Sequence, residues 1–206
     1  MSGKLVVTQS FKDEDWDRLA AAIPWATAQQ RIGYGRALEQ SFGFLQADYG
    51  LFCRDGAAVA GLPLFRFAPA KLFTAIYSLP FDMYGGPLVH PDHLQDADLK
   101  QAMRRHIESR AAAQNAFELC ISTPPGHPET TLSDILGTEG TRFEARDCPV
   151  LDLKRPLDEV LAGYRPAVRR AVASSRRQGL TVTVQPPLAE VRQAFPLYEK
   201  RMKDLG

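Results

Sequence analysis

The stretch "LFCRDGAAVAGLPLF" (residues 51–65) decides the fold predicted for this chain. Its Asp55-Gly56 pair stands between two apolar runs, 46–53 and 57–67, and such a pair is typical of the two-residue turn of a β-hairpin. A third apolar run, 72–79, follows after a short linker. We therefore predict an antiparallel meander of three strands.

The segments on either side of the meander add helices and further strands. A strand at 5–8, a helix between Ser10 and Pro24 and a helix that begins after Thr27 precede it. Downstream we expect a helix at 95–113, a buried strand at 116–122, a short helix at 130–136 and strands at 142–144 and 150–153. This order predicts an α/β (α+β) fold with a mixed, largely antiparallel sheet flanked by helices. It is similar to the GNAT (acetyltransferase) fold, whereas the hairpin disfavours a fully parallel doubly wound sheet.

The composition is that of an ordinary soluble globular protein. Of 206 residues, 45% are hydrophobic and 24% are charged, and the formal net charge of +1 gives no general attraction to nucleic acid or membrane. Three cysteines without a C-x-x-C pair favour reduced thiols over a disulfide framework. The stretch 1–11 lacks the apolar core of a signal peptide, and no apolar run approaches the ~20 residues that span a bilayer. We expect a cytoplasmic protein, with a peripheral membrane contact left open.

The stretch "QRIGYG" (30–35) fits the Q-x-x-G-x-G pattern by which acyl-CoA-dependent N-acetyltransferases hold a pyrophosphate. In that fold the phosphate loop follows the last long strand of the meander, whereas this stretch precedes the meander. Gly33 and Gly35 also fall within a predicted helix. Because a short motif needs its structural context, we expect these glycines to allow close helix packing, or to interrupt the helix, rather than to bind a cofactor.

The position of a phosphate loop is taken by "PFDMYGGPL" (80–88). Gly85 and Gly86 could present backbone N–H groups to a substrate, but the phosphate-loop pattern is not there, so we expect no CoA bound in the usual way. Asp82 could accept a proton from an attacking amine, and Tyr84 could orient the acceptor. The alternative is that Asp82 stabilises a turn above a packed Tyr84.

Six stretches, in this order, resemble the FemAB-like family of tandem GNAT-fold transferases. They are "DWDRL", "PWATAQQRIGYGRALEQSFG", "DGAAVAGLPLF", "SLPFDMYGGPLV", "VLDLKRPLDEVLAGYRPAVRRAVASSRRQGLTV" and "FPLYEKRMKDLG". The resemblance implies two acetyltransferase-like domains side by side, with a cleft for the acceptor. It also implies transfer of an aminoacyl group from aminoacyl-tRNA, or of an acyl group from acyl-CoA, to an amino group of a peptidoglycan or exopolysaccharide precursor.

The same resemblance divides the chain near residue 153. We expect a GNAT-like N-terminal domain at 1–153, followed at 154–206 by a basic helical connector and the start of an incomplete second GNAT-like domain. The first strand of that second domain is predicted at 180–184 and its first long helix at 188–203. Family members usually continue well beyond this helix, so we expect a fragment or a naturally abbreviated form. We expect an exposed apolar surface where the rest of the second domain would pack, and a homodimer could cover it.

Positive charge is concentrated in residues 154–177, which carry seven basic and two acidic side chains. The resemblance implies that Arg165, Arg169 and Arg170 bind the phosphate of an anionic precursor linked to a nucleotide sugar or a lipid. The alternatives are a solvated basic face that complements the helix dipole, or a nucleic-acid patch, which the lack of interleaved aromatic residues disfavours. Arg36 either adds a cationic contact at the acceptor cleft or is an exposed helix residue.

Three functional hypotheses remain open on the sequence alone. The first is a FemAB-like acyl- or aminoacyltransferase, or its N-terminal half. The second is a non-catalytic module that binds an anionic precursor or a partner protein through the basic helix. The third is a CoA-dependent N-acetyltransferase, which the missing phosphate loop disfavours. The "HPDH" stretch at 90–93 does not predict a metal site, because it has no third ligand at a useful spacing.

Overall fold

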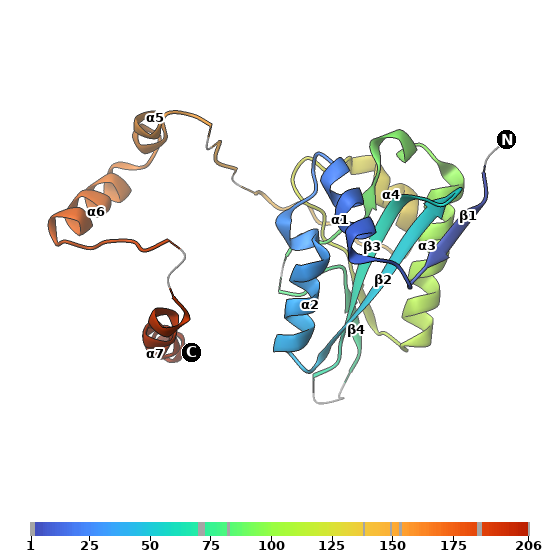
Figure 1. Ribbon diagram of the computed structural model, residues 1–206, viewed down its shortest axis with the longest axis horizontal. Helices are drawn as coiled ribbons and strands as arrows, with labels where there is room; N and C mark the ends of the chain where they lie inside the picture. The colour runs from blue at the N-terminus through green and yellow to red at the C-terminus, as the bar shows by residue number, and fades with distance from the viewer. Residues whose placement is uncertain are drawn as a thin grey trace. The chain divides into compact units, whose positions relative to one another are not determined.

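The computed structural model describes residues 3–69, 73–81, 83–137, 139–148, 150–152, 154–184 and 187–205. The chain divides into two units, Met1–Cys148 and Pro149–Gly206, both drawn in Figure 1. Unit 1 holds the sheet, and unit 2 holds the helices α5–α7. No helix among the described residues has both the length and the apolar character needed to cross a membrane.

The predicted hairpin joins β2 (Leu45–Arg54) to β3 (Ala57–Phe67). Its turn residues Asp55 and Gly56 have φ angles of 50° and 84°. Two successive positive φ angles are what a type I′ turn requires, and this turn matches the twist of the paired strands. The hairpin prediction is therefore confirmed, and its antiparallel register runs over both strands with one irregularity at Phe52/Cys53.

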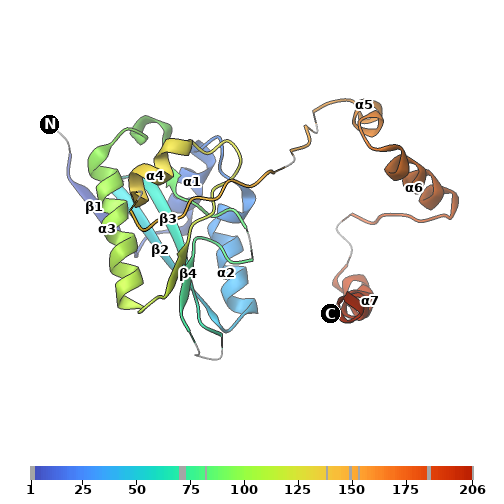
Figure 2. The ribbon, with the colours of Figure 1, turned by 180° about the vertical axis from the view of Figure 1, so that it is seen from behind.

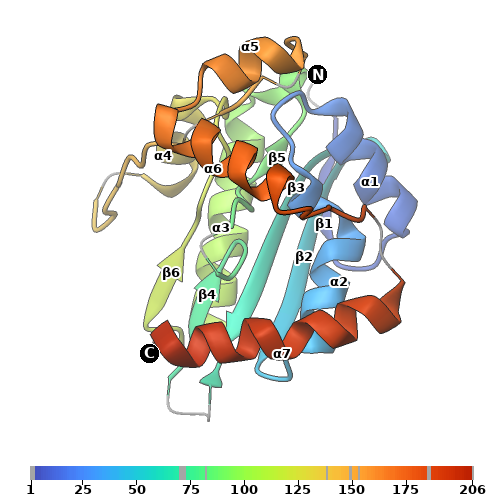
Figure 3. The same ribbon diagram turned by 90° about the vertical axis from the view of Figure 1, so that its left-hand side faces the viewer.

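The sheet has the order β1-β2-β3-β4-β6, with β5 also paired to β3, as Figure 3 shows from the side. β1 (Leu5–Thr8), β4 (Ala75–Tyr77) and β5 (Leu88–Val89) pair antiparallel with their neighbours β2 and β3. β6 (Glu118–Cys120) instead runs parallel to β4. The predicted fold class, a mixed and largely antiparallel sheet flanked by helices, is confirmed.

β3 lies at the centre of this sheet and is buried from Val59 to Phe65. Its Pro63 has no N–H, and a proline is unusual in a central strand. Here β5 pairs with Ala60 and Gly61, whereas β4 pairs only from Phe65 onward. Pro63 thus lies in the gap between β4 and β5, where no partner strand loses a hydrogen bond.

Helices cover both faces of the sheet. α1 (Asp13–Ala22) and α2 (Ile32–Ser41) cover one face (Figure 1), and α3 (Ala97–Ala113) and α4 (Glu129–Leu136) cover the other (Figure 2). Apolar side chains at helical spacing face the sheet on each side and bury several core clusters, as the sequence periodicity predicts. The α3 face includes Phe52, Leu62, Leu64, Leu99, Met103 and Ile107, and the opposite face includes Trp16, Leu19, Leu38, Leu51 and Phe65.

Some predicted strands are shorter than expected or absent. The strand expected at 72–79 is confined to Ala75–Tyr77, and β5 was not predicted. The segments 142–144 and 150–152 have no strand assignment, and Leu153 lies outside the described residues. Phe143 is a single apolar residue between Arg142 and Glu144, which approach each other within 3.8 Å, and it stays exposed. Such a segment offers little apolar surface to bury, so the predicted strand at 142–144 is wrong. The described part of the strand predicted at 150–153 is not formed either, and its Val150 and Leu151 are exposed.

Unit 2 contains α5 (Leu157–Ala162), α6 (Pro166–Arg177) and α7 (Leu188–Leu205). α6 ends at Arg177, shortly before Gly179, whose positive φ of 74° is typical of the residue that follows a helix. The strand predicted at 180–184 is not formed among the described residues, and Leu180, Val182 and Val184 are exposed. The alternation of Leu, Thr and Val there is typical of a strand, but a strand needs a neighbour to pair with.

Candidate functional site

The Q-x-x-G-x-G stretch forms an internal corner of unit 1. The Gln30 side chain is buried; its Oε1 accepts a hydrogen bond from the Thr27 N–H (2.9 Å), and its Nε2 donates one to the Gly86 carbonyl (2.9 Å). The Gln30 carbonyl in turn accepts from Trp16 Nε1 at 2.8 Å. Thr27 begins the short 3₁₀ helix η1 (Ala28–Gln30) instead of α2 directly. Gln30 therefore ties the start of α2 to the loop after β4.

The two glycines of this stretch lie inside α2, as predicted, and they differ in their surroundings. A Cβ atom on Gly33 would meet nothing within 4 Å, whereas one on Gly35 would lie 1.7 Å from the Tyr49 hydroxyl oxygen. Gly35 thus lets α2 lie close against β2, which is one of the two roles expected for these residues.

The predicted loop site at Gly85 and Gly86 is closed by its own backbone. Both N–H groups donate to the Ser122 carbonyl, at 2.9 and 2.7 Å, and both glycines are buried. A Cβ on Gly85 would lie 2.6 Å from the Ser78 carbonyl oxygen, and one on Gly86 2.6 Å from Thr123 Cγ2. These N–H groups hold the loop to the segment after β6, so in this structure they do not point at a ligand.

The two predicted catalytic residues have different outcomes. Asp82 lies outside the described residues. The Tyr84 hydroxyl lies 2.9 Å from Cys148 Sγ, and this hydrogen bond raises the pKa of Tyr84. Because its single proton is donated to Cys148 Sγ, the Tyr84 hydroxyl can contact an amine only as a hydrogen-bond acceptor. The catalytic role of Tyr84 stays a prediction.

A buried histidine that sequence reasoning missed lies beside the same loop. His127 Nε2 is 3.3 Å from the Pro87 carbonyl, His127 Nδ1 is 3.1 Å from the Pro128 carbonyl, and the ring packs edge-on against Trp25. Burial lowers the pKa of His127, although both carbonyls oppose this shift. A His-Pro pair in a turn-rich stretch gives no sequence signal for such a position.

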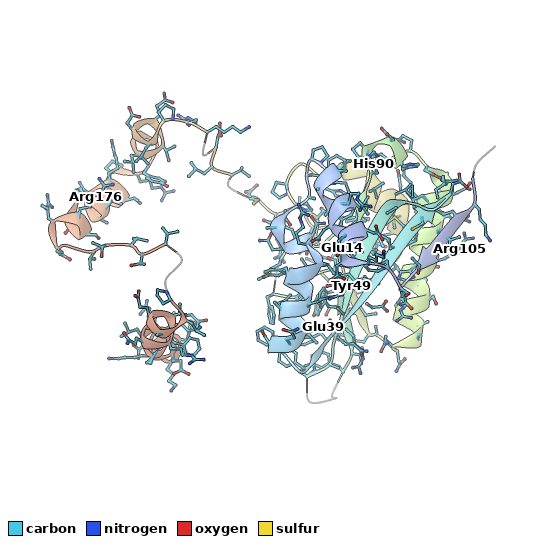
Figure 4. The ribbon with its side chains drawn as sticks, viewed as in Figure 1. Glu14, Glu39, Tyr49, His90, Arg105 and Arg176 are labelled. Carbon is cyan, nitrogen blue, oxygen red and sulfur yellow. The ribbon has the colours of Figure 1, made fainter. Side chains whose placement is uncertain are left out.

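A cavity of about 330 Å³ lies at β2, and Arg36 is one of its lining residues. Figure 4 labels two others, Glu39 on α2 and Tyr49 on β2. Arg36 is exposed on α2, and its guanidinium forms an ion pair with Asp13. The complete lining is Gln9, Phe11, Ile32, Arg36, Glu39, Gln46, Ala47, Asp48, Tyr49, Leu64, Arg66, Ile76, Arg110 and Gln114.

The polar groups of this cavity are only partly satisfied. Asp48 forms an ion pair with Arg110, and Glu39 Oε1 accepts from the Ala47 N–H at 2.6 Å. The Tyr49 hydroxyl and the Arg66 Nε are buried without a hydrogen-bond partner among the described residues. Burial, with a smaller contribution from Glu39, raises the pKa of Tyr49, so its phenol stays protonated. The signal that could have found this site is a charged residue, Asp48 or Arg66, within an apolar strand.

The predicted phosphate-binding arginines lie on α6 in unit 2. Arg165, Arg169 and Arg170 are exposed, and the described residues place no carboxylate within ion-pair distance of them. Arg165 is the N-cap residue, and its carbonyl accepts from the Arg169 N–H at 3.2 Å. Figure 4 labels Arg176 on the same helix. The three guanidinium groups are therefore available to an anionic ligand, although phosphate binding stays a prediction.

No protein-family model matches this chain, and no curated protein matches it. Among solved structures, the chain is similar to FemX, at 16% identity over 55% of this chain and a TM-score of 0.43. That match spans only 25% of the FemX chain. The chain is also similar to an acetyltransferase of Trypanosoma brucei, at 12% identity over 73% of this chain and all of that one, with a TM-score of 0.46. A possible acetyltransferase of Clostridium difficile 630 is similar at 9% identity over 72% of this chain and 99% of that one, with a TM-score of 0.44.

Proposed function

We propose that the protein is an acyltransferase that moves an acyl or aminoacyl group onto an amino group of a cell-envelope precursor. The observation that carries the proposal is the loop after β4. The order of helices and strands follows the acetyltransferase pattern, yet the Gly85 and Gly86 N–H groups bind Ser122 and do not face a CoA pyrophosphate. Such a loop favours a transferase whose donor is held outside unit 1.

The proposed reaction forms a C–N bond as the amine attacks an ester or thioester, and breaks the C–O or C–S bond to the carrier. It requires a positioned amine, a proton acceptor and stabilisation of the oxyanion. We assign the proton-acceptor role to Asp82. We assign the positioning of the acceptor to Tyr84, whose hydroxyl oxygen can accept a hydrogen bond from the amine while its proton is donated to Cys148 Sγ.

The anionic part of the precursor is assigned to α6. Arg165, Arg169 and Arg170 have no carboxylate partners among the described residues, and guanidinium groups bind phosphate through paired hydrogen bonds. The proposed acceptor is therefore linked to a nucleotide sugar or to a lipid phosphate. The proposed donor is aminoacyl-tRNA or acyl-CoA, and a lipid-linked acceptor would bring the protein to the membrane surface.

The same α6 observation favours a second candidate function, a non-catalytic module that binds the precursor or a partner protein. Its arginines are exposed on a helix whose charge needs no catalytic group to attract an anion. The two candidates share the ligand and differ in turnover, so one experiment addresses both.

The test is a titration of the chain with a UDP-linked sugar peptide, with undecaprenyl phosphate and with acetyl-CoA. We expect the first or second ligand to bind, and Arg169→Ala with Arg170→Ala to weaken binding by about tenfold or more. Arg176→Ala with Arg177→Ala, at the other end of α6, is the matched control and should change binding by less than about threefold.

Transfer of a labelled aminoacyl group to the bound precursor separates the two candidates. Transfer supports the acyltransferase, and tight binding without transfer from either donor supports the binding module. If acetyl-CoA alone binds and raises the melting temperature, both are wrong and a CoA-dependent N-acetyltransferase takes their place.

A further inference from the structure

One half of β2 has an unpaired edge. β3 pairs with β2 along Leu45–Arg54, whereas β1 pairs only with Leu51–Arg54. After β1 the chain turns away, since the Ser10 N–H donates to Thr8 Oγ1 (3.1 Å) and α1 begins at Asp13. Within the described part of the chain, the segment of β2 before Leu51 therefore has a neighbouring strand on one side only.

Backbone hydrogen bonds show which residues face the open side. The Phe44 carbonyl accepts from Ala68 N–H (3.1 Å), just beyond the end of β3, and the Lys4 carbonyl accepts from Asp55 N–H (3.3 Å), just before β1. Because the main-chain groups of a strand alternate in direction, even-numbered residues in this half of β2 face β3 and odd-numbered ones face the open side. The Ala47 N–H, which binds the Glu39 carboxylate instead of β3, agrees with this assignment.

Several main-chain groups are consequently available on the open side. Among them are the Ala47 carbonyl and the N–H and carbonyl of Tyr49, for which the described residues supply no backbone partner. Unpaired strand edges are templates for the addition of another strand. The 330 Å³ cavity lies against this edge, since Gln46, Ala47, Asp48 and Tyr49 all line it.

One arginine of the cavity lining has no ion-pair partner among the described residues. Arg36 and Arg110 are paired with Asp13 and Asp48. Arg66 forms no ion pair among the described residues, and its Nε is buried without a partner. In the β2–β3 register Arg66 is the direct neighbour of Gln46, so both side chains project to the same face of the sheet.

We propose that the open edge of β2 binds an extended peptide segment by strand addition, with an acidic side chain of that peptide at Arg66. The Tyr49 and Ala47 main chains bind the peptide backbone. A peptide residue opposite Gln46 projects to the face of Arg66, so a glutamate or aspartate there supplies the missing counter-charge. Phe11 and Ile32 line the apolar part of the cavity. This site is independent of acyl transfer and uses neither the loop after β4 nor α6.

The test uses the acetylated and amidated pentapeptide Thr-Val-Glu-Val-Thr, whose β-branched residues favour the extended form. Binding is followed by isothermal titration and by hydrogen exchange of the uniformly ¹⁵N-labelled protein. We expect slowed exchange of the Tyr49 N–H and unchanged exchange of the Gly50 N–H, which already faces β3. Two further peptides carry N-methyl groups on alternate amides. One of them should lose binding and the other retain it, because only one set of amides faces β2.

The charge requirement is tested by a double-mutant cycle. Arg66→Gln and replacement of the peptide Glu by Gln should each weaken binding about tenfold, with little further loss when combined. Arg105→Gln, an exposed arginine of α3 that does not line this cavity, is the control and should leave binding unchanged.

Several results would overturn the proposal. Equal binding of both N-methylated peptides rules out strand addition, and binding that is insensitive to Arg66→Gln rules out the acidic requirement. No binding by any of these peptides also contradicts it. Concentration-dependent dimerisation that protects the Tyr49 N–H without peptide would assign the edge to a second copy of the chain. None of these results bears on the acyltransferase proposal. That proposal is tested by ligand binding of the α6 arginine variants and by transfer of the aminoacyl group.

Discussion

Two polar regions of unit 1 differ in how completely their hydrogen-bonding groups are used. In the closed corner, formed by Gln30, Gly85, Gly86, Ser122 and His127, the Gln30 side-chain amide, the two glycine N–H groups and the Ser122 carbonyl have partners, although the neighbouring Trp25 Nε1 has none among the described residues. At the open edge, formed by Ala47, Tyr49 and Arg66, main-chain groups, a phenol and a guanidinium nitrogen have no hydrogen-bond partner among the described residues. Since an unmade buried hydrogen bond costs more than a made one contributes, the corner stabilises the fold and the edge is suited to a ligand.

The comparison also shows that the residues whose sequence pattern suggests a binding site are not the residues whose polar groups are free to bind a ligand. The corner contains the sequence patterns that suggest phosphate binding, a Q-x-x-G-x-G stretch and a Gly-Gly pair. In the structure both patterns form hydrogen bonds within unit 1. The edge comes from an ordinary strand sequence, "LQADYG" at 45–50, whose importance depends on where β1 stops. A glycine motif therefore indicates close backbone packing at least as well as ligand binding.

The largest effect is expected at the corner from Gln30→Ala. The substitution leaves the Gly86 carbonyl and the Thr27 N–H without partners and opens a cavity, so the free energy of unfolding should fall by about 2–4 kcal/mol. Urea denaturation followed by circular dichroism measures it. Gln29→Ala is the control, because no hydrogen bond of the Gln29 side chain is found among the described residues, and its effect should be below about 1 kcal/mol. Equal losses in both variants would show that the corner does not depend on these bonds.

Two glycines of α2 connect the corner to the edge and allow a matched pair of substitutions. Gly35→Ala should destabilise unit 1 by about 1–3 kcal/mol, because its Cβ would collide with the Tyr49 hydroxyl and approach Phe65 within 3.0 Å. Gly33→Ala meets open space in the same helix and should stabilise it by about 0.5–1 kcal/mol. The same thermal or urea unfolding series measures both. Opposite signs are the expected result, and a stabilising Gly35→Ala would contradict the close approach of α2 to β2.

A smaller effect, dependent on pH, is expected from His127. Burial lowers its pKa below the ordinary value of 6.5, so the unfolded chain binds a proton more readily than the folded one. Its contribution to stability is therefore complete above pH 6.5 and is lost as the pH falls from there toward the lowered pKa. The loss is at most about 1.4 kcal/mol per pH unit for each such group.

His106 has to be separated from His127 in this experiment, since burial lowers its pKa as well. Unfolding in urea at pH 7.5, 6.5 and 5.5 should show a shallower pH dependence in His127→Gln than in the unchanged chain. His106→Gln measures the share of the second histidine. A pH dependence that His127→Gln leaves unaltered would mean that the two carbonyl contacts at Pro87 and Pro128 offset its burial.

Much of the fold could be predicted from local sequence, and the failures have a common physical cause. The Asp55-Gly56 turn, the meander and the apolar faces of α1 and α3 depend on neighbouring residues, so periodicity and turn chemistry predict them. β5 is two residues long and exists because the chain returns to β3 beside Pro63, a long-range event. The predicted strands at 142–144 and 180–184 fail for the converse reason, since their local pattern finds no partner strand in the described chain.

The site was predicted less well than the fold. The sequence leaves two alternatives for Arg36, a contact at the acceptor cleft or an exposed helix residue; in the structure it is exposed and lines the cavity at β2. The residues that define this cavity, Tyr49 and Arg66, look like ordinary strand residues in the sequence. The role of Tyr49 and Arg66 depends on the absence of a neighbouring strand and of hydrogen-bond partners among the described residues. Sequence periodicity does not predict such an absence. The sequence predicts that Gly85 and Gly86 present N–H groups to a substrate, whereas in this structure both N–H groups donate to the Ser122 carbonyl of a distant segment.

The smallest stability effect is expected from Tyr49→Phe, and it bears most directly on the contrast between corner and edge. The Tyr49 hydroxyl is buried without a protein partner among the described residues, so its removal breaks no hydrogen bond within the described chain. The variant should be as stable as the unchanged chain or more stable by up to about 1 kcal/mol. Tyr34→Phe is the control, since the Tyr34 hydroxyl lies 2.7 Å from Met83 Sδ and its loss should cost a few tenths of a kcal/mol. A clear destabilisation by Tyr49→Phe would show that this hydroxyl is satisfied after all, by water or by a group of the chain, and the edge would then resemble the corner.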